Sequence, residues 1–166
     1  MIKMTRIDYR LLHGQVAFAW TNNLSADAIL IANDDVVNDS FRKKTLNLAK
    51  PNGVKLIFKS IPDSIKAIES GVTDKYKVFV IVEDVNDAYR LAQGTDQIKI
   101  INLGLAAKRE NTKNIAKAVY VTEQEIIQLE DLESKGIEVI VKQAPNDVDA
   151  QFGKLLHKET NLWQFK

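Results

Sequence analysis

Short runs of β-branched and other apolar residues alternate along this chain with longer segments in which apolar residues recur every three or four positions. The short runs fit buried strands, and the longer segments fit amphipathic helices. Strands that alternate with helices in this way indicate right-handed crossovers and a mainly parallel sheet with helices on both faces. We therefore expect a doubly wound α/β fold with an open sheet of about seven strands, in a single domain that spans residues 1–166.

The expected strands are short and are separated by turn residues. They cover residues 2–7, 28–33, 54–58, 77–82, 97–103, 118–122 and 138–143. Helices are expected between them, except between residues 103 and 118, where the link is polar and basic. Their inward faces include Val85, Ala88 and Leu91, which follow a possible cap at Asp84. Other expected faces are Val37, Phe41, Thr45 and Leu48 in one helix, and Val148, Phe152 and Leu155 in a closing helix. The sequence from Thr122 to Glu125 predicts a capping box at the start of a further helix.

Composition excludes several classes of function. Lys and Arg number 23 against 22 Asp and Glu, so the chain lacks the strong positive charge of a dedicated nucleic-acid-binding domain. It has no cysteine, which excludes thiolate catalysis and Cys-based metal sites, and two histidines, His13 and His157, are few for a metal site. No apolar run reaches the length of a membrane span, and no signal peptide is recognisable. We expect a cytoplasmic protein without a metal site.

Polar residues that could carry chemistry gather directly after the first expected strand. Asp8, Arg10 and His13 lie within six residues, just ahead of an expected helix. Ligands of open parallel sheets bind at the carboxyl ends of strands. A neutral imidazole is a nucleophile that can accept a phosphoryl group, provided that an acceptor such as Asp8 or a backbone carbonyl holds its second nitrogen. A loop with these three residues is also compatible with an ordinary solvated turn.

The neighbours of His13 suit the same chemistry. Arg10 offers a permanently charged, planar set of donors that matches phosphate oxygens. Gly14 allows close backbone approach, and the free amides of Gly14, Gln15 and Val16 at a helix start would donate to an anion.

Other strand ends carry weaker signals. Ser60 could donate to a phosphoryl oxygen or form a turn, and the acids after Asn33 could bind a cation or simply precede a helix. Lys108, Arg109 and Lys113 give the loop after Gly104 a positive face, which suits an acidic partner or a solvated loop. Trp20 is expected in the core, whereas His157 is expected to be exposed and Trp163 to be an anchor or an exposed contact.

The nine residues from Asp8 to Val16, DYRLLHGQV, resemble the active-site segment of IIB components of mannose-type (mannose/fructose/sorbose) sugar phosphotransferase systems, which reads Asp-x-Arg-Leu-Ile-His-Gly-Gln-Val. The resemblance continues at residues 33–34, 49–54, 101–104, 121–122, 136–139 and 143–145, and so covers nearly the whole chain in order.

The resemblance implies a phosphocarrier with a doubly wound, mainly parallel sheet that contains one antiparallel strand. His13 matches the histidine that accepts a phosphoryl group through Nδ1 from a phosphohistidine of the IIA partner. The group then passes to a sugar held by the membrane subunits IIC and IID, so membrane association would occur only through partners. Arg10 matches the phosphate-stabilising arginine, and Asp8 matches its supporting acid. Such a carrier needs no metal and no bound cofactor, because the phosphoryl group arrives already activated on the partner histidine.

Two positions depart from the family pattern. Leu12 replaces the usual Ile, and Gly104-Leu105-Ala106 stands where Gly-Gly-Met is common, so that a second glycine is lost. The resemblance therefore implies no role for the loop that begins at Gly104.

Two other functions use the same fold. A non-catalytic module could bind a nucleotide or a phosphorylated metabolite, although both G-x-G-x-x-G and G-x-x-x-x-G-K-[ST] are absent. A signalling module could use phosphorylation of His13 only as a mark.

Overall fold

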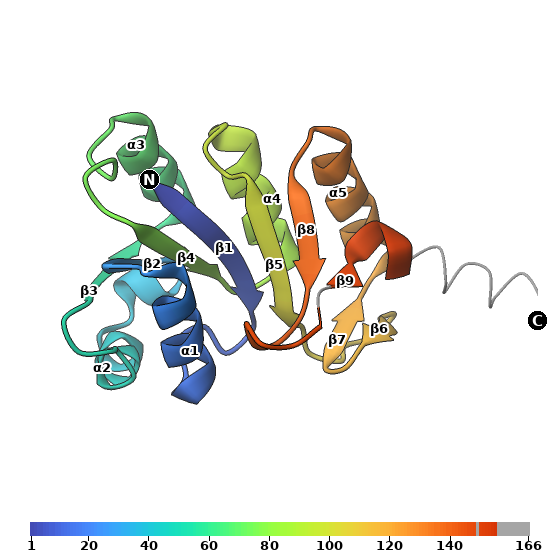
Figure 1. Ribbon diagram of the computed structural model, residues 1–166, viewed down its shortest axis with the longest axis horizontal. Coiled ribbons are helices and arrows are strands. Elements are labelled where there is room, and N and C mark those ends of the chain that lie inside the picture. Colours follow the sequence, from blue (N-terminus) through green and yellow to red (C-terminus); the bar gives the residue numbers. More distant parts are fainter. Residues whose placement is uncertain (149, 156–166) are drawn as a thin grey trace, which may run out of the picture.

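The computed structural model describes residues 1–148 and 150–155, and a mainly parallel seven-stranded sheet forms its centre (Figure 1). The strand order is β3-β2-β4-β1-β5-β8-β9, and among the described strands of this sheet only β9 runs antiparallel to its neighbour. The strands of this sheet are β1 Ile2–Asp8, β2 Ala28–Ala32, β3 Lys55–Lys59, β4 Val78–Val82, β5 Ile100–Leu105, β8 Glu138–Val141 and β9 Ala150–Gln151. The doubly wound fold that the alternating pattern predicts is confirmed.

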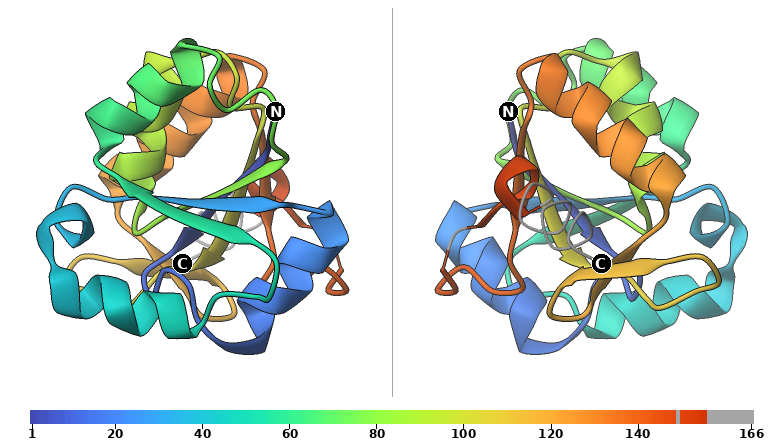
Figure 2. Two further views of the ribbon diagram at one scale, coloured as in Figure 1. Left: turned by 90° about the vertical axis from the view of Figure 1, so that its left-hand side faces the viewer. Right: turned by 90° about the vertical axis from the view of Figure 1, so that its right-hand side faces the viewer.

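Five α-helices cover the sheet within the described residues, and they divide between its two faces (Figure 2). One face carries α3, α4 and α5, and the opposite face carries α1 and α2, with a short 3₁₀ turn before α2. Their bounds are α1 Gly14–Leu24, α2 Ser40–Leu48, α3 Ile61–Glu69, α4 Val85–Gly94 and α5 Glu123–Ser134, and the 3₁₀ turn is Val36–Asn38. Among the described residues, no helix combines the length and the apolar character that crossing a membrane requires.

Alternate residues of the central strands supply two separate cores. In β4, Val80 belongs to the core under α3, α4 and α5, whereas Phe79 and Ile81 belong to the core under α1 and α2. Successive side chains of a strand point to opposite faces of the sheet, so a strand covered on both faces is apolar throughout. All five residues of β2 and of β4 are buried, as this arrangement requires.

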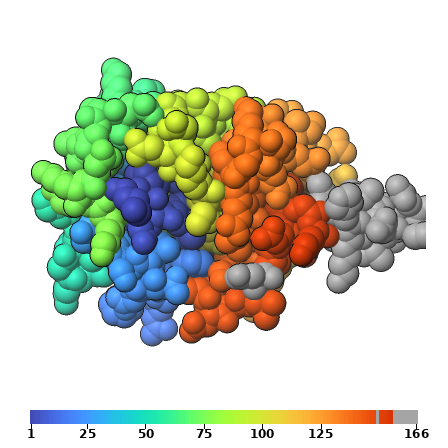
Figure 3. Space-filling model, turned by 45° about the horizontal axis from the view of Figure 1, so that its top comes forward, coloured from blue at the N-terminus to red at the C-terminus, as the bar shows by residue number. Residues whose placement is uncertain are grey.

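Backbone hydrogen bonds fix the start of β1 at the amino edge of the sheet. The amino group of Met1 donates to the carbonyls of Thr73, Asp74 and Tyr76, at 3.1, 3.3 and 2.6 Å. Figure 3 shows this end of the chain, in dark blue, between the green segment that precedes β4 and the yellow segment that leads into β5. The start of β1 is thereby tied to the segment that precedes β4.

Helix starts follow the capping signals of the sequence. Asp84 accepts a hydrogen bond from the amide of Asp87, and Thr122 and Glu125 form the expected capping box. Ser60 accepts from the amide of Asp63 and so caps α3. Ser60 therefore forms the turn at the start of α3, which is one of the two roles expected for it.

Two expectations for the carboxyl-terminal half are wrong. Residues 118–122 were expected to be a strand of the main sheet, but β7 Val119–Val121 pairs with β6 Lys113–Ala116 in a separate two-stranded ribbon. The seventh strand of the main sheet is instead β9, which pairs with β8. Val148 does not begin the closing helix: it is 89% exposed, whereas Phe152 is fully buried within a helical turn at residues 152–155.

The expected inward face of α2 is also wrong, although the helix itself is confirmed. Phe41 and Leu48 are 81% and 89% exposed, and the buried residues of this region are Val36 and Leu46. Val36 lies in the 3₁₀ turn before α2, and the extended backbone of Asp39 between the two elements interrupts the helical spacing.

Candidate functional site

The loop from residue 9 to residue 13 links the end of β1 to the start of α1 at the carboxyl edge of the sheet. β1 lies between β4 and β5, where the strand order reverses, and ligands of doubly wound folds bind at such a point. Leu11 has a φ of 59° and donates its amide to the carbonyl of Asp8 at 2.9 Å. A left-handed leucine costs roughly 1–2 kcal/mol. The buried side chains of Leu11 and Leu12 hold the loop in this conformation.

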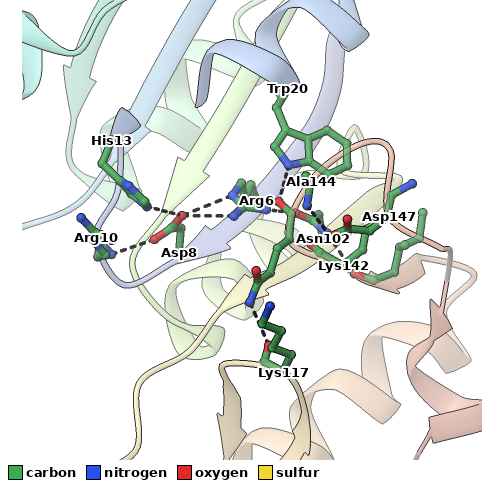
Figure 4. Close-up of polar contacts among 12 residues, drawn as sticks. Arg6, Asp8, Arg10, His13, Trp20, Asn102, Lys117, Lys142, Ala144 and Asp147 are labelled. Atoms are coloured by element: carbon green, nitrogen blue, oxygen red, sulfur yellow. Dashed lines mark hydrogen bonds and ion pairs between the residues drawn. The ribbon is translucent and has the colours of Figure 1, made fainter. Parts of the chain in front are cut away.

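Asp8 is the centre of the polar contacts in this loop (Figure 4). Its side chain is 1% exposed, and its Oδ1 accepts from the amide of Arg10 at 2.9 Å. Its Oδ2 accepts from Nε and Nη2 of Arg6 at 3.3 and 3.2 Å. The same Oδ2 lies 3.3 Å from Nε2 of His13. Asp8 therefore connects β1 to the expected nucleophile.

His13 occupies the N-cap position of α1, with an extended backbone. Its Nε2 is buried and lies at ion-pair distance from Asp8, at an angle outside the hydrogen-bond range, and no described residue offers Nε2 a hydrogen bond. The imidazole is 21% exposed as a whole, so this exposed area belongs to its other ring atoms. The ring thus turns one nitrogen toward the protein and leaves part of its remaining edge open to a reactant.

Arg10 joins the site through its backbone and leaves its guanidinium in solvent. Its amide donates to Asp8, its side chain is exposed, and it has no ion pair within the described part of the chain. Figure 4 shows Arg10 and His13 on the same side of Asp8. The structure therefore brings together the three residues that the sequence singles out.

The start of α1 adds backbone donors beside His13. Gly14 and Gln15 are exposed, Val16 is partly exposed, and no described side chain caps this helix end. The first amides of a helix lack partners inside the helix. These donors and the helix dipole favour an anion in front of α1.

Arg6 and Asn102 also belong to this network, although no motif in the sequence assigns either of them to the site. The guanidinium of Arg6 is 2% exposed and donates through Nη1 to Oδ1 of Asn102 at 2.6 Å. Burial lowers the pKa of Arg6, and the charge of Asp8 opposes this effect. The one signal in the sequence is an arginine within an apolar strand, where an unpaired charge is costly.

The remaining candidates form structural contacts. Asn33 accepts from the amides of Asp35 and Val36, and Asp34 accepts from the amide of Ile61 and pairs with Arg90 at 2.9 Å. Within residues 1–148 and 150–155, no cluster of His, Asp and Glu suits a metal ion. Asn33 therefore caps the turn that follows it, whereas Asp34 links the end of β2 to the start of α3 and to Arg90 of α4.

The basic loop after Gly104 is largely paired. Arg109 contacts Glu125 at 2.7 Å and Lys113 contacts Glu123 at 3.3 Å, whereas Lys108 is exposed. Trp20 is buried, as expected, and donates its Nε1 to the carbonyl of Gln143 at 2.8 Å. His157 and Trp163 lie outside the described residues.

Comparison with known proteins agrees with this architecture. The family model described as PTS system sorbose subfamily IIB component matches residues 2–164. The fructose-specific EIIB component of the Bacillus subtilis phosphotransferase system (PTS) is 31% identical over 159 residues, which are 96% of this chain and 98% of that protein. The mannose-specific EIIAB component of Escherichia coli is 30% identical over 158 residues, 95% of this chain and 49% of that protein.

A solved structure shares the whole fold. The IIBSor domain of the sorbose permease from Klebsiella pneumoniae superposes with a TM-score of 0.90 at 28% identity, covering 95% of this chain and 97% of that one. The family match spans almost the complete sequence, including the loop that carries Asp8, Arg10 and His13. This chain therefore belongs to the sorbose-subfamily IIB components of the PTS, which are phosphotransferases of sugar uptake.

Proposed function

We propose that this chain is a phosphocarrier in which His13 accepts a phosphoryl group from a phosphohistidine of a IIA protein and transfers it to a sugar. The observation that carries the proposal is the setting of the imidazole. Its Nε2 is buried against Asp8 at 3.3 Å, while other atoms of the ring are exposed, and His13 itself is the N-cap residue of α1.

Nδ1 of His13 is the nitrogen suited to attack. The bond between nitrogen and phosphorus in the donor breaks, and its electron pair returns to the donor imidazole. A new bond forms from the lone pair of Nδ1, while the proton on Nε2 stays in place. The phosphorylated ring then carries a positive charge beside the carboxylate of Asp8, which stabilises it.

Arg10 and the start of α1 act on the phosphoryl group itself. Transfer of a phosphoryl group leaves little covalent work to the protein, so positioning and charge stabilisation dominate. The exposed guanidinium of Arg10 can contact two phosphoryl oxygens at once. The amides of Gly14, Gln15 and Val16 supply further donors from one side.

The partners follow from the chemistry and from the relatives. A relative named EIIAB component carries a segment similar to this chain within a longer protein, which supports a IIA protein as the phosphoryl donor. The acceptor is a sugar held by the membrane subunits IIC and IID. The chain then contacts a membrane only through these partners, on the cytoplasmic side, and its residues 1–166 act as one domain.

The test is intact-mass measurement after incubation with phosphoenolpyruvate, enzyme I, HPr and a mannose-type IIA protein. Wild type is compared with His13→Ala and with His157→Ala, which removes the other histidine of the chain. We expect one acid-labile phosphoryl adduct on wild type and on His157→Ala, and none on His13→Ala. Addition of membranes that contain IIC and IID, together with their sugar, should remove the adduct and produce a sugar phosphate.

Two outcomes would contradict the proposal. An adduct that persists on His13→Ala would exclude His13 as the acceptor. Absence of any adduct while the IIA protein is phosphorylated would exclude the phosphocarrier function and favour a ligand-binding module on the same fold.

A further inference from the structure

Strand β5 contains one extra residue beside the site, and that residue is Gly104. In the parallel pairing of β1 with β5, Ile7 lies opposite Leu103, but Asp8 lies opposite Leu105. The register therefore shifts by one residue at Gly104, at the point where β1 reaches Asp8. Bulges of this kind are common next to active sites, where they redirect a side chain.

The side chain that this bulge accommodates is Arg6. A Cβ atom built on Gly104 would lie 2.2 Å from Nη1 and 2.3 Å from Cζ of Arg6. The guanidinium lies directly against the backbone of β5, and any side chain at this position would displace it. Gly104 is thus required here for close approach.

Asn102, two residues earlier in β5, fixes Nη1 of the same guanidinium, the nitrogen that does not contact Asp8. Its Oδ1 accepts from Nη1 of Arg6 at 2.6 Å. Its Nδ2 donates to the carbonyls of Ile140 and Lys142, at 3.3 and 3.0 Å, so the amide is held by the end of β8 and the residue after it. The orientation of Arg6 is therefore determined by β5 and β8, which lie 90 or more residues away in the sequence.

Arg6 in turn determines which oxygen of Asp8 faces His13. Nε and Nη2 both contact Oδ2, the oxygen that lies 3.3 Å from Nε2 of His13, while Oδ1 is occupied by the amide of Arg10. Asp8 consequently has no freedom to rotate. A carboxylate that is fixed before the reaction needs no reorganisation when positive charge develops on the imidazole.

We propose that Arg6 is a positioning residue, seated by the Gly104 bulge and Asn102, which holds the negative charge of Asp8 beside Nε2 of His13 and so favours the tautomer with its proton on Nε2. Nδ1 then keeps its lone pair for the phosphoryl group. This inference rests on the proposed role of His13 and adds the residues that prepare it. Arg6 itself is buried and touches no reactant.

The decisive variant is Gly104→Ala, because it displaces Arg6 while leaving Arg6, Asp8 and His13 chemically intact. Gly94→Ala is the matched control: a Cβ built on Gly94 would lie 2.3 Å from Cδ1 of Ile65, in apolar packing between α3 and α4. Both variants create a similar overlap, but only one of them disturbs the guanidinium.

Two measurements separate positioning from loss of stability. The first is the ¹⁵N spectrum of the neutral His13 ring in a His157→Gln background, which reports the nitrogen that carries the proton. The second is the rate of phosphoryl acceptance as a function of IIA concentration. For Gly104→Ala we expect a mixture of tautomers and a kcat that falls roughly 10- to 100-fold with little change in KM. For Gly94→Ala we expect a lower melting temperature, with the wild-type tautomer and kcat.

A second variant keeps the proposal testable if Gly104→Ala does not fold. Arg6→Lys retains the buried charge and loses the planar arrangement of donors, so it should give the same mixture of tautomers and the same loss of kcat. A wild-type tautomer and kcat in the folded variant would overturn the proposal, as would equal effects in Gly94→Ala. If wild type accepts no phosphoryl group, the proposed function fails, and the ¹⁵N spectra still decide whether Arg6 positions Asp8 and His13.

Discussion

Oδ2 of Asp8 lies 3.3 Å from Nε2 of His13, across the loop that separates β1 from α1. The same oxygen lies 3.2 Å from Nη2 of Arg6, whose guanidinium is almost completely buried. Asp8 therefore has two partners of different kinds, one that is permanently charged and one that becomes charged during phosphoryl transfer. Changes at Asp8 should affect both the stability of the protein and its reaction.

Asp8→Asn should lower the free energy of unfolding by about 3 kcal/mol, because it leaves the buried Arg6 without a counter-charge. The urea midpoint measures this loss, with Asp96→Asn as a control at an exposed carboxylate. A loss below about 1 kcal/mol, relative to that control, would show that Asp8 is not the main partner of Arg6.

Arg10→Lys should separate stability from activity. The guanidinium of Arg10 is exposed and has no ion pair in the described part of the chain, so the free energy of unfolding should change by less than about 0.5 kcal/mol. Phosphoryl acceptance should slow roughly 100-fold, since an ammonium cannot contact two oxygens as the planar group does. Rapid-quench measurement of the adduct tests this, and a wild-type rate would remove Arg10 from its proposed role.

Asp87→Asn should change the pH dependence of stability. Burial and, next, the charge of Asp84 raise the pKa of Asp87 from 3.8 to about 6, although Arg90 lies 3.3 Å away. Between these two values the folded protein holds a proton that the unfolded chain has lost, so the free energy of unfolding falls as the pH rises from 4 to 6.

Asp87→Asn removes the free-energy cost of ionising this buried carboxyl group, and it also removes the ion pair to Arg90. The net gain at pH 7 should be roughly 1 kcal/mol, and the decline between pH 4 and pH 6 should be smaller than in wild type. Urea unfolding at pH 5 and at pH 7 measures both effects. An unchanged slope would show that the titration of Asp87 does not contribute to it.

Ala118→Gly should stabilise the β6–β7 ribbon. Ala118 is an exposed residue with a φ of 58° in the two-residue turn between these strands. Glycine adopts that conformation without steric strain. The relief of strain should exceed the larger loss of chain entropy on folding by about 0.5 kcal/mol. Ala116→Gly in β6, where φ is not positive, should instead destabilise. Thermal unfolding of the pair tests the prediction, and a lower melting temperature for Ala118→Gly would contradict it.

The alternating pattern predicts the central part of the fold because strands covered on both faces must be apolar throughout. β2 and β4 show this directly. The pattern does not reveal strands that are recognisable only by their hydrogen bonds to a neighbouring strand. β6 includes Lys113 and Asn114 and has no apolar run, and β9 contains only two residues, so neither has the periodicity of a buried strand. Residues 118–122 do have an apolar pattern, but the pattern does not identify the partner of a strand, which here is β6 and not a strand of the main sheet.

The local part of the site is visible in the sequence, and the distant part is not. Asp8, Arg10 and His13 lie within one short segment, where their residue types already indicate phosphoryl chemistry. Asn102 is 96 residues from Arg6, and the two meet only because β1 and β5 are neighbours in the sheet. A sequence shows that a buried arginine needs partners, but only the strand order identifies them.

The two edges of the main sheet bear on how this protein behaves at high concentration. β9 adds only two antiparallel residues beyond β8, and β3 at the other edge begins and ends with a lysine. Short edge strands and flanking lysines discourage a further strand from adding to a sheet. Copies of the protein are therefore protected against joining through their sheets, and the central strands can be strongly apolar without making the chain prone to fibrous aggregation.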